Sequence, residues 1–173
     1  MSANLEGNAM DEWNLATLVE RGGVHHNVSG ANVREIVFSM TNLLPPLPPH
    51  VDMEKLFTEI LQREALISTG VGRGIAIPHP RKPMLDENET PLVAVGFPAI
   101  PIDWNTQDGS KVHTVFLIIS SSVKQHLGTL SKINFLCQQE KFHSLIINRA
   151  SRDEIVAAIK IAETAWRTGH GET

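Results

Sequence analysis

The sequence is poor in cysteine and has no long apolar run. Cys137 is the only cysteine among 173 residues, so no disulfide can form within the chain and a reducing compartment is expected. It lies in the apolar stretch 133–137, where a small buried side chain is expected rather than a reactive thiol. No segment reaches the ~20 apolar residues that cross a bilayer, and the first residues lack the layout of a secretory signal. We therefore predict a soluble, cytoplasmic protein without direct membrane insertion.

Charge of one sign is not in strong excess either. The chain has 15 Lys and Arg against 19 Asp and Glu, a formal net charge of -4, so neither nucleic acid nor an anionic membrane is a predicted partner. Apolar residues make up 42% and charged residues 20%, as in folded globular proteins. A chain of this length can bury one hydrophobic core. We predict a flexible leader at residues 1–9, which has no periodicity, and a single domain over residues 10–173.

Apolar spacing predicts helices toward both ends of the chain and strands between them. Helical spacing covers residues 13–20, 33–44, 53–67, 127–137, 142–147 and 155–161. Apolar runs bounded by breakers predict strands at residues 24–28, 75–77, 92–97 and 112–119. Helices before and after the strands imply a sheet covered on both faces. The predicted fold is α/β, a three-layer α/β/α sandwich with a mixed central sheet.

Two signals mark the junction between predicted helices 33–44 and 53–67. Pro45 ends the first helix, because proline removes a backbone donor and clashes with the preceding turn. Asp52 is a good N-cap for the second helix. The segment between them, residues 45–49, is dense in proline, short and stiff. We interpret it as a connection between helices rather than a domain boundary.

The stretch 70–79 holds the most informative motif. Glycine occupies every second position from Gly70 to Gly74, and a short apolar strand then leads to Pro78 and His79. Glycines allow backbone conformations closed to other residues, and proline stiffens the point where the imidazole leaves the strand. Neutral imidazole can attack phosphorus near physiological pH and carry the group covalently. His79 is therefore a candidate nucleophile, and the alternative is a solvated or hydrogen-bonded structural histidine at a strand end.

These glycines do not have the pattern of a nucleotide-binding loop. No Lys followed by Ser or Thr comes after them, and the G-x-G of residues 72–74 leads into a strand rather than a helix. ATP is therefore not the expected phosphoryl donor, and no cofactor is predicted.

Residues 63–79 read REALISTGVGRGIAIPH, which resembles the active-site signature of phosphotransferase system IIA domains of the fructose and mannitol class, including the nitrogen-regulatory members. The family pattern REALISTGIGxGIAIPH is matched almost throughout. The resemblance covers roughly residues 13–165 and is moderate over residues 112–136. It implies that His79 is the phosphorylated residue and that the donor is a phosphohistidine on a small carrier protein of the HPr or NPr type.

Two further residues match the family's site. The resemblance implies that Arg63 helps to hold the phosphoryl group, and a guanidinium fork suits that charge; alone, it could be a solvated arginine at a helix end. Residues 125–131, QHLGTLS, resemble the family's HLxxL segment, where a second histidine faces the first. His126 would then orient His79 or donate a hydrogen bond to the phosphoryl group, aided by free backbone donors at a helix start. The alternative is a surface histidine that caps a helix.

The sequence departs from the family pattern at two places. Pro80 follows the histidine where the family usually has glycine or alanine, and residues 45–49 hold more proline than the family norm. Pro80 bears on which partner docks more than on the chemistry.

The other histidines show no recognised ligand spacing such as H-E-x-x-H, so no metal site is predicted. His113 precedes His126 on a predicted strand, and alternation leaves open whether it faces the same pocket; it is not included in the site. The histidines outside the motifs are His25, His26, His50, His113, His143 and His170.

The favoured function is a phosphoryl carrier, a phosphotransferase in which His79 accepts the group and Arg63 and His126 stabilise it. The absence of a visible IIB domain favours the nitrogen-regulatory type, whose downstream partner would be a regulated target protein. A sugar-specific IIA component that passes phosphate to a IIB domain is an alternative. Two others are a regulatory pseudo-carrier and a metal-dependent hydrolase that uses His79, His126 and one more ligand, although no acidic ligand set is evident.

Overall fold

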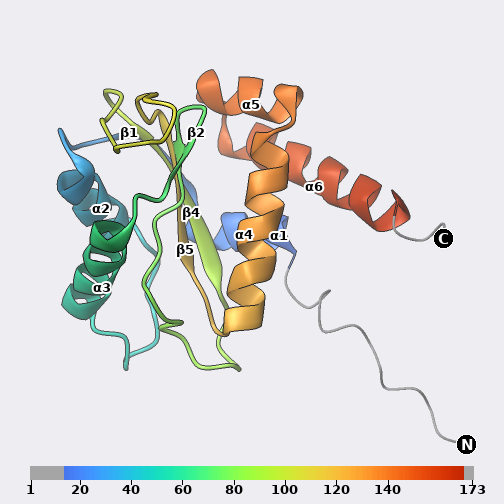
Figure 1. Cartoon of the computed structure of the whole chain (residues 1–173). Coiled ribbons are helices and arrows are strands. Elements are labelled where there is room, and N and C mark those ends of the chain that lie inside the picture. Colours follow the sequence, from blue (N-terminus) through green and yellow to red (C-terminus); the bar gives the residue numbers. More distant parts are fainter. Residues whose placement is uncertain (1–13, 170–173) are drawn as a thin grey trace, which may run out of the picture.

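The computed structural model describes residues 14–169, which form a five-stranded mixed sheet with helices on either side (Figure 1). The strand order is β1-β4-β5-β3-β2. The pairs β1–β4 and β3–β5 are parallel, and the pairs β4–β5 and β2–β3 are antiparallel. The strands span Val24–Val28 (β1), Gly70–Gly72 (β2), Ile75–Ala76 (β3), Leu92–Pro98 (β4) and Thr114–Ile119 (β5).

Six helices flank the sheet within the described part of the chain. Asp52 is the N-cap of α3 as predicted, since its Oδ1 accepts hydrogen bonds from the amides of Glu54 and Lys55. The helix before it ends at Asn42, ahead of Pro45. The helices span Leu15–Gly22 (α1), Val33–Asn42 (α2), Met53–Leu66 (α3), Val123–Cys137 (α4), Glu140–Ile147 (α5) and Arg152–Gly169 (α6).

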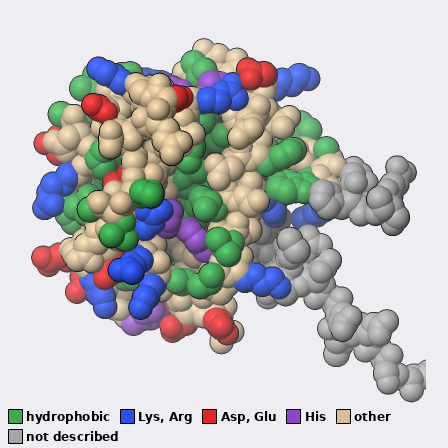
Figure 2. Space-filling view, in the orientation of Figure 1, with side chains coloured by type: hydrophobic (Ala, Val, Ile, Leu, Met, Phe, Trp, Pro, Cys, Tyr) green, Lys and Arg blue, Asp and Glu red, His purple; other side chains and the backbone are tan. Residues whose placement is uncertain are grey.

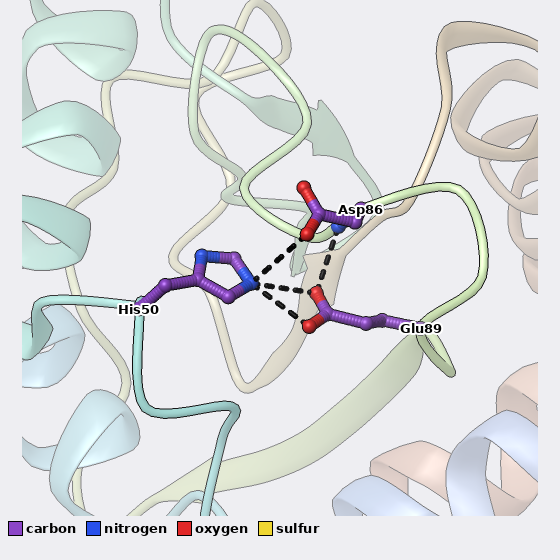
Figure 3. A group of neighbouring side chains, drawn as sticks. All are labelled: His50, Asp86 and Glu89. Carbon is purple, nitrogen blue, oxygen red and sulfur yellow. Dashed lines mark hydrogen bonds and ion pairs between the residues drawn. The ribbon is translucent and has the colours of Figure 1, made fainter.

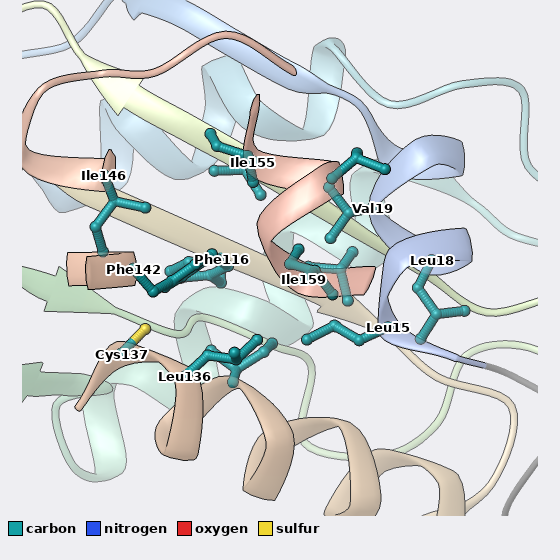
Figure 4. Packing of buried hydrophobic residues seen from close by; sticks show 14 of the residues in the cluster. Leu15, Leu18, Val19, Phe116, Leu136, Cys137, Phe142, Ile146, Ile155 and Ile159 are labelled. Carbon is teal, nitrogen blue, oxygen red and sulfur yellow. The ribbon is translucent and has the colours of Figure 1, made fainter. Parts of the chain in front are cut away.

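Side-chain alternation along the central strands divides the interior into two cores. Phe116 and Ile118 of β5 face one core, and Val115 and Leu117 face the other. The first core is covered by α1, α4, α5 and α6, whose apolar residues pack together as Figure 4 shows. The second core is covered by α2 and α3. The predicted three-layer α/β/α sandwich with a mixed sheet is confirmed.

Cys137 lies in the first core and is 4% exposed. Burial raises the pKa of its thiol to about 12. The thiol is therefore protonated and fills space, as the sequence indicated.

Two expectations concern the chain ends and the membrane. The predicted leader, residues 1–9, lies outside the described residues. Of the helices within residues 14–169, none has the length and apolar content required to cross a membrane.

Substitution of glycine by alanine should have opposite effects on stability at two helical positions, Gly22 and Gly128. A Cβ on Gly22 would lie 2.0 Å from the carbonyl oxygen of Val93 in β4, whereas a Cβ on Gly128 would meet nothing within 4 Å. We expect Gly22→Ala to lower the free energy of unfolding by about 2 kcal/mol or more, because α1 must move away from the sheet. Gly128→Ala should raise it by about 0.5–1 kcal/mol through helix propensity.

Urea unfolding with both variants checks this pair, with the m-value as the test of unchanged two-state behaviour. Equal effects of the same sign at the two positions would contradict the close packing of α1 on β4.

Candidate functional site

The parallel pair β3–β5 brings two predicted site residues to one edge of the sheet. The chain leaving β3 reaches His79, and the chain leaving β5 turns into α4, which carries His126. The two imidazole rings face each other, with centroids 4.6 Å apart and planes at 49°. His79 is 9% exposed, and His126 is partly buried. The structure therefore unites two residues that are far apart in the sequence.

The backbone around His79 is held on both sides. The amide of Ile77 donates to the carbonyl of Thr69 (3.0 Å), and the amide of Ile118 donates to the carbonyl of Pro78 (3.1 Å). Nδ1 of His79 lies 2.8 Å from the carbonyl oxygen of Ile77. A carbonyl can only accept, so Nδ1 carries the proton in this bond, and the neutral ring has its lone pair on Nε2.

The surroundings of His79 keep its ring neutral. Burial lowers the pKa of His79, the hydrogen bond to Ile77 opposes that effect, and the positive charge of Arg63 lowers the pKa further. A neutral imidazole with a free Nε2 lone pair is the nucleophilic form of the side chain. The arrangement suits covalent group transfer near neutral pH.

His126 is fixed by its helix and by a serine. Its amide donates to the carbonyl of Ser122 (3.0 Å), so its own N–H is not one of the free donors expected from the sequence. Its ring nitrogen Nδ1 lies 3.2 Å from Oγ of Ser120, a buried residue. Burial, followed by electrostatic interaction with His79 and with the positive charge of Arg63, lowers the pKa of His126 to about 4. His126 therefore contributes a neutral ring, and the hydroxyl of Ser120 can accommodate either tautomer.

Arg63 lies in the last turn of α3. One of its guanidinium nitrogens, Nη1, donates to the carbonyl of Ile67, just beyond the helix, at 2.9 Å. Its charge also lowers the pKa values of His79 and His126. The structure thus places all three predicted site residues within electrostatic reach of one another.

Sequence reasoning missed Glu64, which fixes the segment beside the histidines. Its carboxylate accepts from the amide (2.8 Å) and hydroxyl (2.5 Å) of Thr69 and from Nε1 of Trp104 (2.8 Å). The carbonyl of Thr69 in turn accepts from the amide of Ile77. Glu64 stands next to Arg63 in the matched string, and that adjacency was the available signal. Ser120 was missed as well, and its only signal was its place at the end of a strand.

The glycine motif forms a tight hairpin between β2 and β3. Gly72, Arg73 and Gly74 have φ values of 89°, 56° and 78°, so glycine relieves strain at two of the three positions. A Cβ on Gly74 would lie 2.2 Å from the ring of His113, whose Nε2 lies 3.2 Å from the carbonyl oxygen of Arg73. His113 therefore faces the hairpin, a direction that strand alternation alone left open.

A small cavity of about 80 Å³ adjoins His126. In Figure 2, histidine side chains lie near the centre of one face, flanked by basic and hydrophobic side chains. Pro80, the departure from the family pattern, is part of the cavity wall. The cavity is lined by Pro80, Arg81, Lys82, Pro83, Ile118, Ser120, Val123 and His126.

The geometry alone does not favour a metal-dependent hydrolase at this place. Glu64 is the carboxylate whose charge reaches His79, and it is already bonded to Thr69 and Trp104. Within residues 14–169, the group of side chains that could hold a metal ion includes neither His79 nor His126.

Comparisons with known proteins agree with the sequence motif. Residues 17–161 match the family model described as phosphoenolpyruvate-dependent sugar phosphotransferase system, EIIA 2. The chain is 33% identical over 109 residues to the nitrogen regulatory protein of Pseudomonas aeruginosa, covering 62% of this chain and 69% of that protein. It is 26% identical over 147 residues to the fructose-specific EIIABC component of Bacillus subtilis, covering 84% of this chain and 23% of that protein.

Among solved structures, the chain is similar to the nitrogen regulatory protein IIA-Ntr of Neisseria meningitidis. The TM-score is 0.71 at 21% sequence identity, and the match covers 83% of this chain and 97% of that one. At this identity the likeness shows the fold.

The electrostatic arrangement predicts how the two imidazoles titrate. The pKa of His79 should lie below the ordinary value of 6.5, and that of His126 should lie at about 4. Because the unfolded chain takes up these protons near pH 6.5, the free energy of unfolding should decrease as pH falls below that value. Arg63→Gln should raise the pKa of both histidines, since it removes a positive charge from their surroundings.

Imidazole ¹⁵N chemical shifts over a pH titration measure both pKa values and the tautomer of His79. Arg152→Gln serves as the control, because Arg152 forms an exposed ion pair with Asp153 in α6. A proton on Nε2 rather than Nδ1 of His79 at neutral pH would contradict the assignment.

Proposed function

The chain belongs to the EIIA 2 family of the phosphoenolpyruvate-dependent sugar phosphotransferase system, and from that premise we propose that His79 is its phosphoryl acceptor. The hydrogen bond from Nδ1 of buried His79 to the carbonyl of Ile77, 2.8 Å long, carries this proposal. It leaves the lone pair of the neutral ring on Nε2, and the centroid of the His126 ring lies 4.6 Å from that of His79. That nitrogen is the group we propose to attack phosphorus.

The proposed step transfers the group between two histidines. The lone pair on Nε2 of His79 forms a new N–P bond while the N–P bond of the carrier's phosphohistidine breaks. The electrons of the broken bond return to the carrier's imidazole nitrogen, so no other reactant is consumed. Negative charge is spread over the three equatorial oxygens in the transition state, and catalysis therefore depends on positioning and charge stabilisation.

The carbonyl of Ile77 has a second role in this proposal. After transfer, phosphorus occupies Nε2 while the proton on Nδ1 remains bonded to the carbonyl of Ile77. A phosphorylated ring that keeps this proton is a better leaving group than one that has lost it. The same hydrogen bond thus prepares His79 to accept the phosphoryl group and to release it to the next protein.

Arg63 and His126 would stabilise the phosphoryl group. Arg63 uses a donor on the carbonyl of Ile67, and a guanidinium has five N–H donors, so others can contact phosphoryl oxygens. His126 can donate from Nε2 when the hydroxyl of Ser120 donates to its Nδ1. Neither residue needs to change its charge during transfer.

We further propose that the chain is of the nitrogen-regulatory type, with a phosphocarrier of the HPr or NPr type as donor. The 33% identity to a nitrogen regulatory protein supports this. Phosphorylation would add about two negative charges beside the exposed surface, which can change how a target protein binds. A sugar-specific role is the second candidate, because the match to a fructose-specific component extends over 84% of this chain. A cytoplasmic location stays a prediction.

Incubation with phosphoenolpyruvate, Enzyme I and a small phosphocarrier tests the acceptor. We expect one acid-labile phosphoryl group per chain by intact mass, none in His79→Ala, and transfer slowed roughly 100-fold in His126→Ala and in Arg63→Gln. His26→Ala is the matched control, because Nε2 of His26 faces backbone carbonyls of Arg149 and Ala150. Undiminished phosphorylation of His79→Ala would move the acceptor elsewhere, and no phosphorylation with any carrier would favour a pseudo-carrier.

The two candidate outputs differ in the fate of the phosphoryl group on the chain. If the chain is of the nitrogen-regulatory type, the purified phosphorylated chain should keep its phosphoryl group when it is mixed with an isolated fructose-type IIB domain. The unphosphorylated chain should accept the group faster from an NPr-type than from an HPr-type carrier. Rapid and stoichiometric transfer to the IIB domain would instead support the sugar-specific candidate. Mass spectrometry of both partners over time measures the transfer.

A further inference from the structure

Three side chains from two segments that are far apart in the sequence lie close together, at a place other than the His79–His126 pair. Nε2 of His50 lies 2.9 and 2.8 Å from the two carboxylate oxygens of Glu89 and 3.6 Å from Oδ2 of Asp86. Figure 3 shows the imidazole pointing at both carboxylates from the opposite side of the group. One donor atom from each residue lies within 4.8 Å of the others. This spacing is close to what a single small cation requires.

The backbone on both sides of the group is anchored in the second core. His50 precedes Val51, which is 8% exposed, and Asp86 follows Leu85, which is 5% exposed. The amide of Leu85 donates to the carbonyl of Ser120 at 3.2 Å. The buried neighbours Val51 and Leu85 thus fix the backbone positions from which the side chains of His50 and Asp86 extend. A bound ion would require only small adjustments of these side chains.

Backbone hydrogen bonds in the turn between Asp86 and Glu89 also orient the carboxylate of Glu89. The amide of Asp86 donates to its Oε2 at 2.8 Å, and the amide of Glu89 donates to the carbonyl of Asp86 at 2.9 Å. Such hydrogen bonds hold a ligand carboxylate in a fixed direction. Both oxygens of this carboxylate nevertheless lie within 2.9 Å of Nε2 of His50.

Charge favours a cation at this point. Asp86 and Glu89 each carry a negative charge, and within residues 14–169 both pair with His50. The imidazole provides a positive charge only when it is protonated. When the imidazole is neutral, no positive charge within this group of three side chains balances the two carboxylates.

We propose that His50, Asp86 and Glu89 form a binding site for one divalent first-row transition-metal ion. The metal would take the place of the proton on Nε2 of His50. A mixed set of one imidazole and two carboxylates suits Zn²⁺, Co²⁺ or Mn²⁺, whereas Mg²⁺ and Ca²⁺ prefer oxygen alone. The side chains of His50 and Asp86 are 46% and 78% exposed, so water completes the coordination shell. This proposal does not depend on the proposed function.

The site was invisible in the sequence because its ligands are 39 residues apart between His50 and Glu89. Short-range ligand spacing on one helix or loop is the pattern that a sequence search recognises. Here the turn at residues 86–89 supplies two ligands, and the connection between α2 and α3 supplies the third.

The histidine pair at the functional site is the competing metal-binding place. Two neutral imidazoles with centroids 4.6 Å apart could also bind Zn²⁺, so the experiment must separate the two locations. Zn²⁺ titration by isothermal calorimetry is performed on the whole chain and on the variants His50→Ala, Glu89→Gln, Asp86→Asn and the double variant His79→Ala/His126→Ala. His26→Ala controls for loss of an arbitrary histidine, and circular dichroism verifies that every variant is folded.

We expect one equivalent of Zn²⁺ to bind. The affinity should fall about 10-fold or more in His50→Ala and in Glu89→Gln, and it should be unchanged in His79→Ala/His126→Ala and in His26→Ala. Asp86→Asn should have a smaller effect, because its oxygen is the most distant. Addition of Mn²⁺ should broaden the NMR signals of His50 and residues 85–89 first.

Two results would overturn the proposal. The first is stoichiometric Zn²⁺ binding that is lost in His79→Ala/His126→Ala and kept in His50→Ala, which would place the metal at the histidine pair. The second is the absence of saturable binding to the unmodified chain. Glu89→Gln keeps the shape of the side chain, so a loss of affinity in this variant cannot be attributed to a missing side chain.

Discussion

The parallel pairing of β3 with β5 is the constraint on which the candidate functional site depends. Only the short register from Ile75 opposite Thr114 to Ala76 opposite Val115 defines it, and the amide of Ile118 extends it by bonding to the carbonyl of Pro78. Because both strands run in the same direction, the segments that leave them emerge at one edge of the sheet. The two-residue strand β3 is sufficient to position these segments because its partner β5 is buried along its whole length and lies between the two cores.

Burial and charge act together at the histidine pair. Burial alone makes a charged imidazole unfavourable, and the charge of Arg63 adds to that effect. The same cation favours a phosphoryl group that carries about two negative charges. In the proposed mechanism, Arg63 therefore has two roles: with burial, it favours the neutral rings before transfer, and it would stabilise the charge that arrives with the phosphoryl group.

Apolar periodicity was sufficient to predict the helices, the strands β4 and β5, and the three layers. Asp52 could be placed as an N-cap because its signal is local. By contrast, β2 consists of Gly70–Gly72, which has no apolar pattern and pairs only because the hairpin brings it beside β3. The candidate site residues His79, Arg63 and His126 were predicted through a matched motif, and periodicity alone would not have singled them out. The direction of His113 and the role of Ser120 depend on contacts between distant segments, which no local pattern encodes.

The segment from Pro80 to Glu89 connects the candidate phosphoryl-transfer site with the proposed metal site. Its first half lines the cavity beside His126 with Arg81 and Lys82, and its second half holds the carboxylates that face His50. Between them, the amide of Leu85 is bonded to the carbonyl of Ser120, and the side chain of Leu85 is buried. This anchor separates a basic stretch from an acidic one. Because this anchor joins the segment to the end of β5 and to the second core, one buried contact positions both the basic and the acidic half.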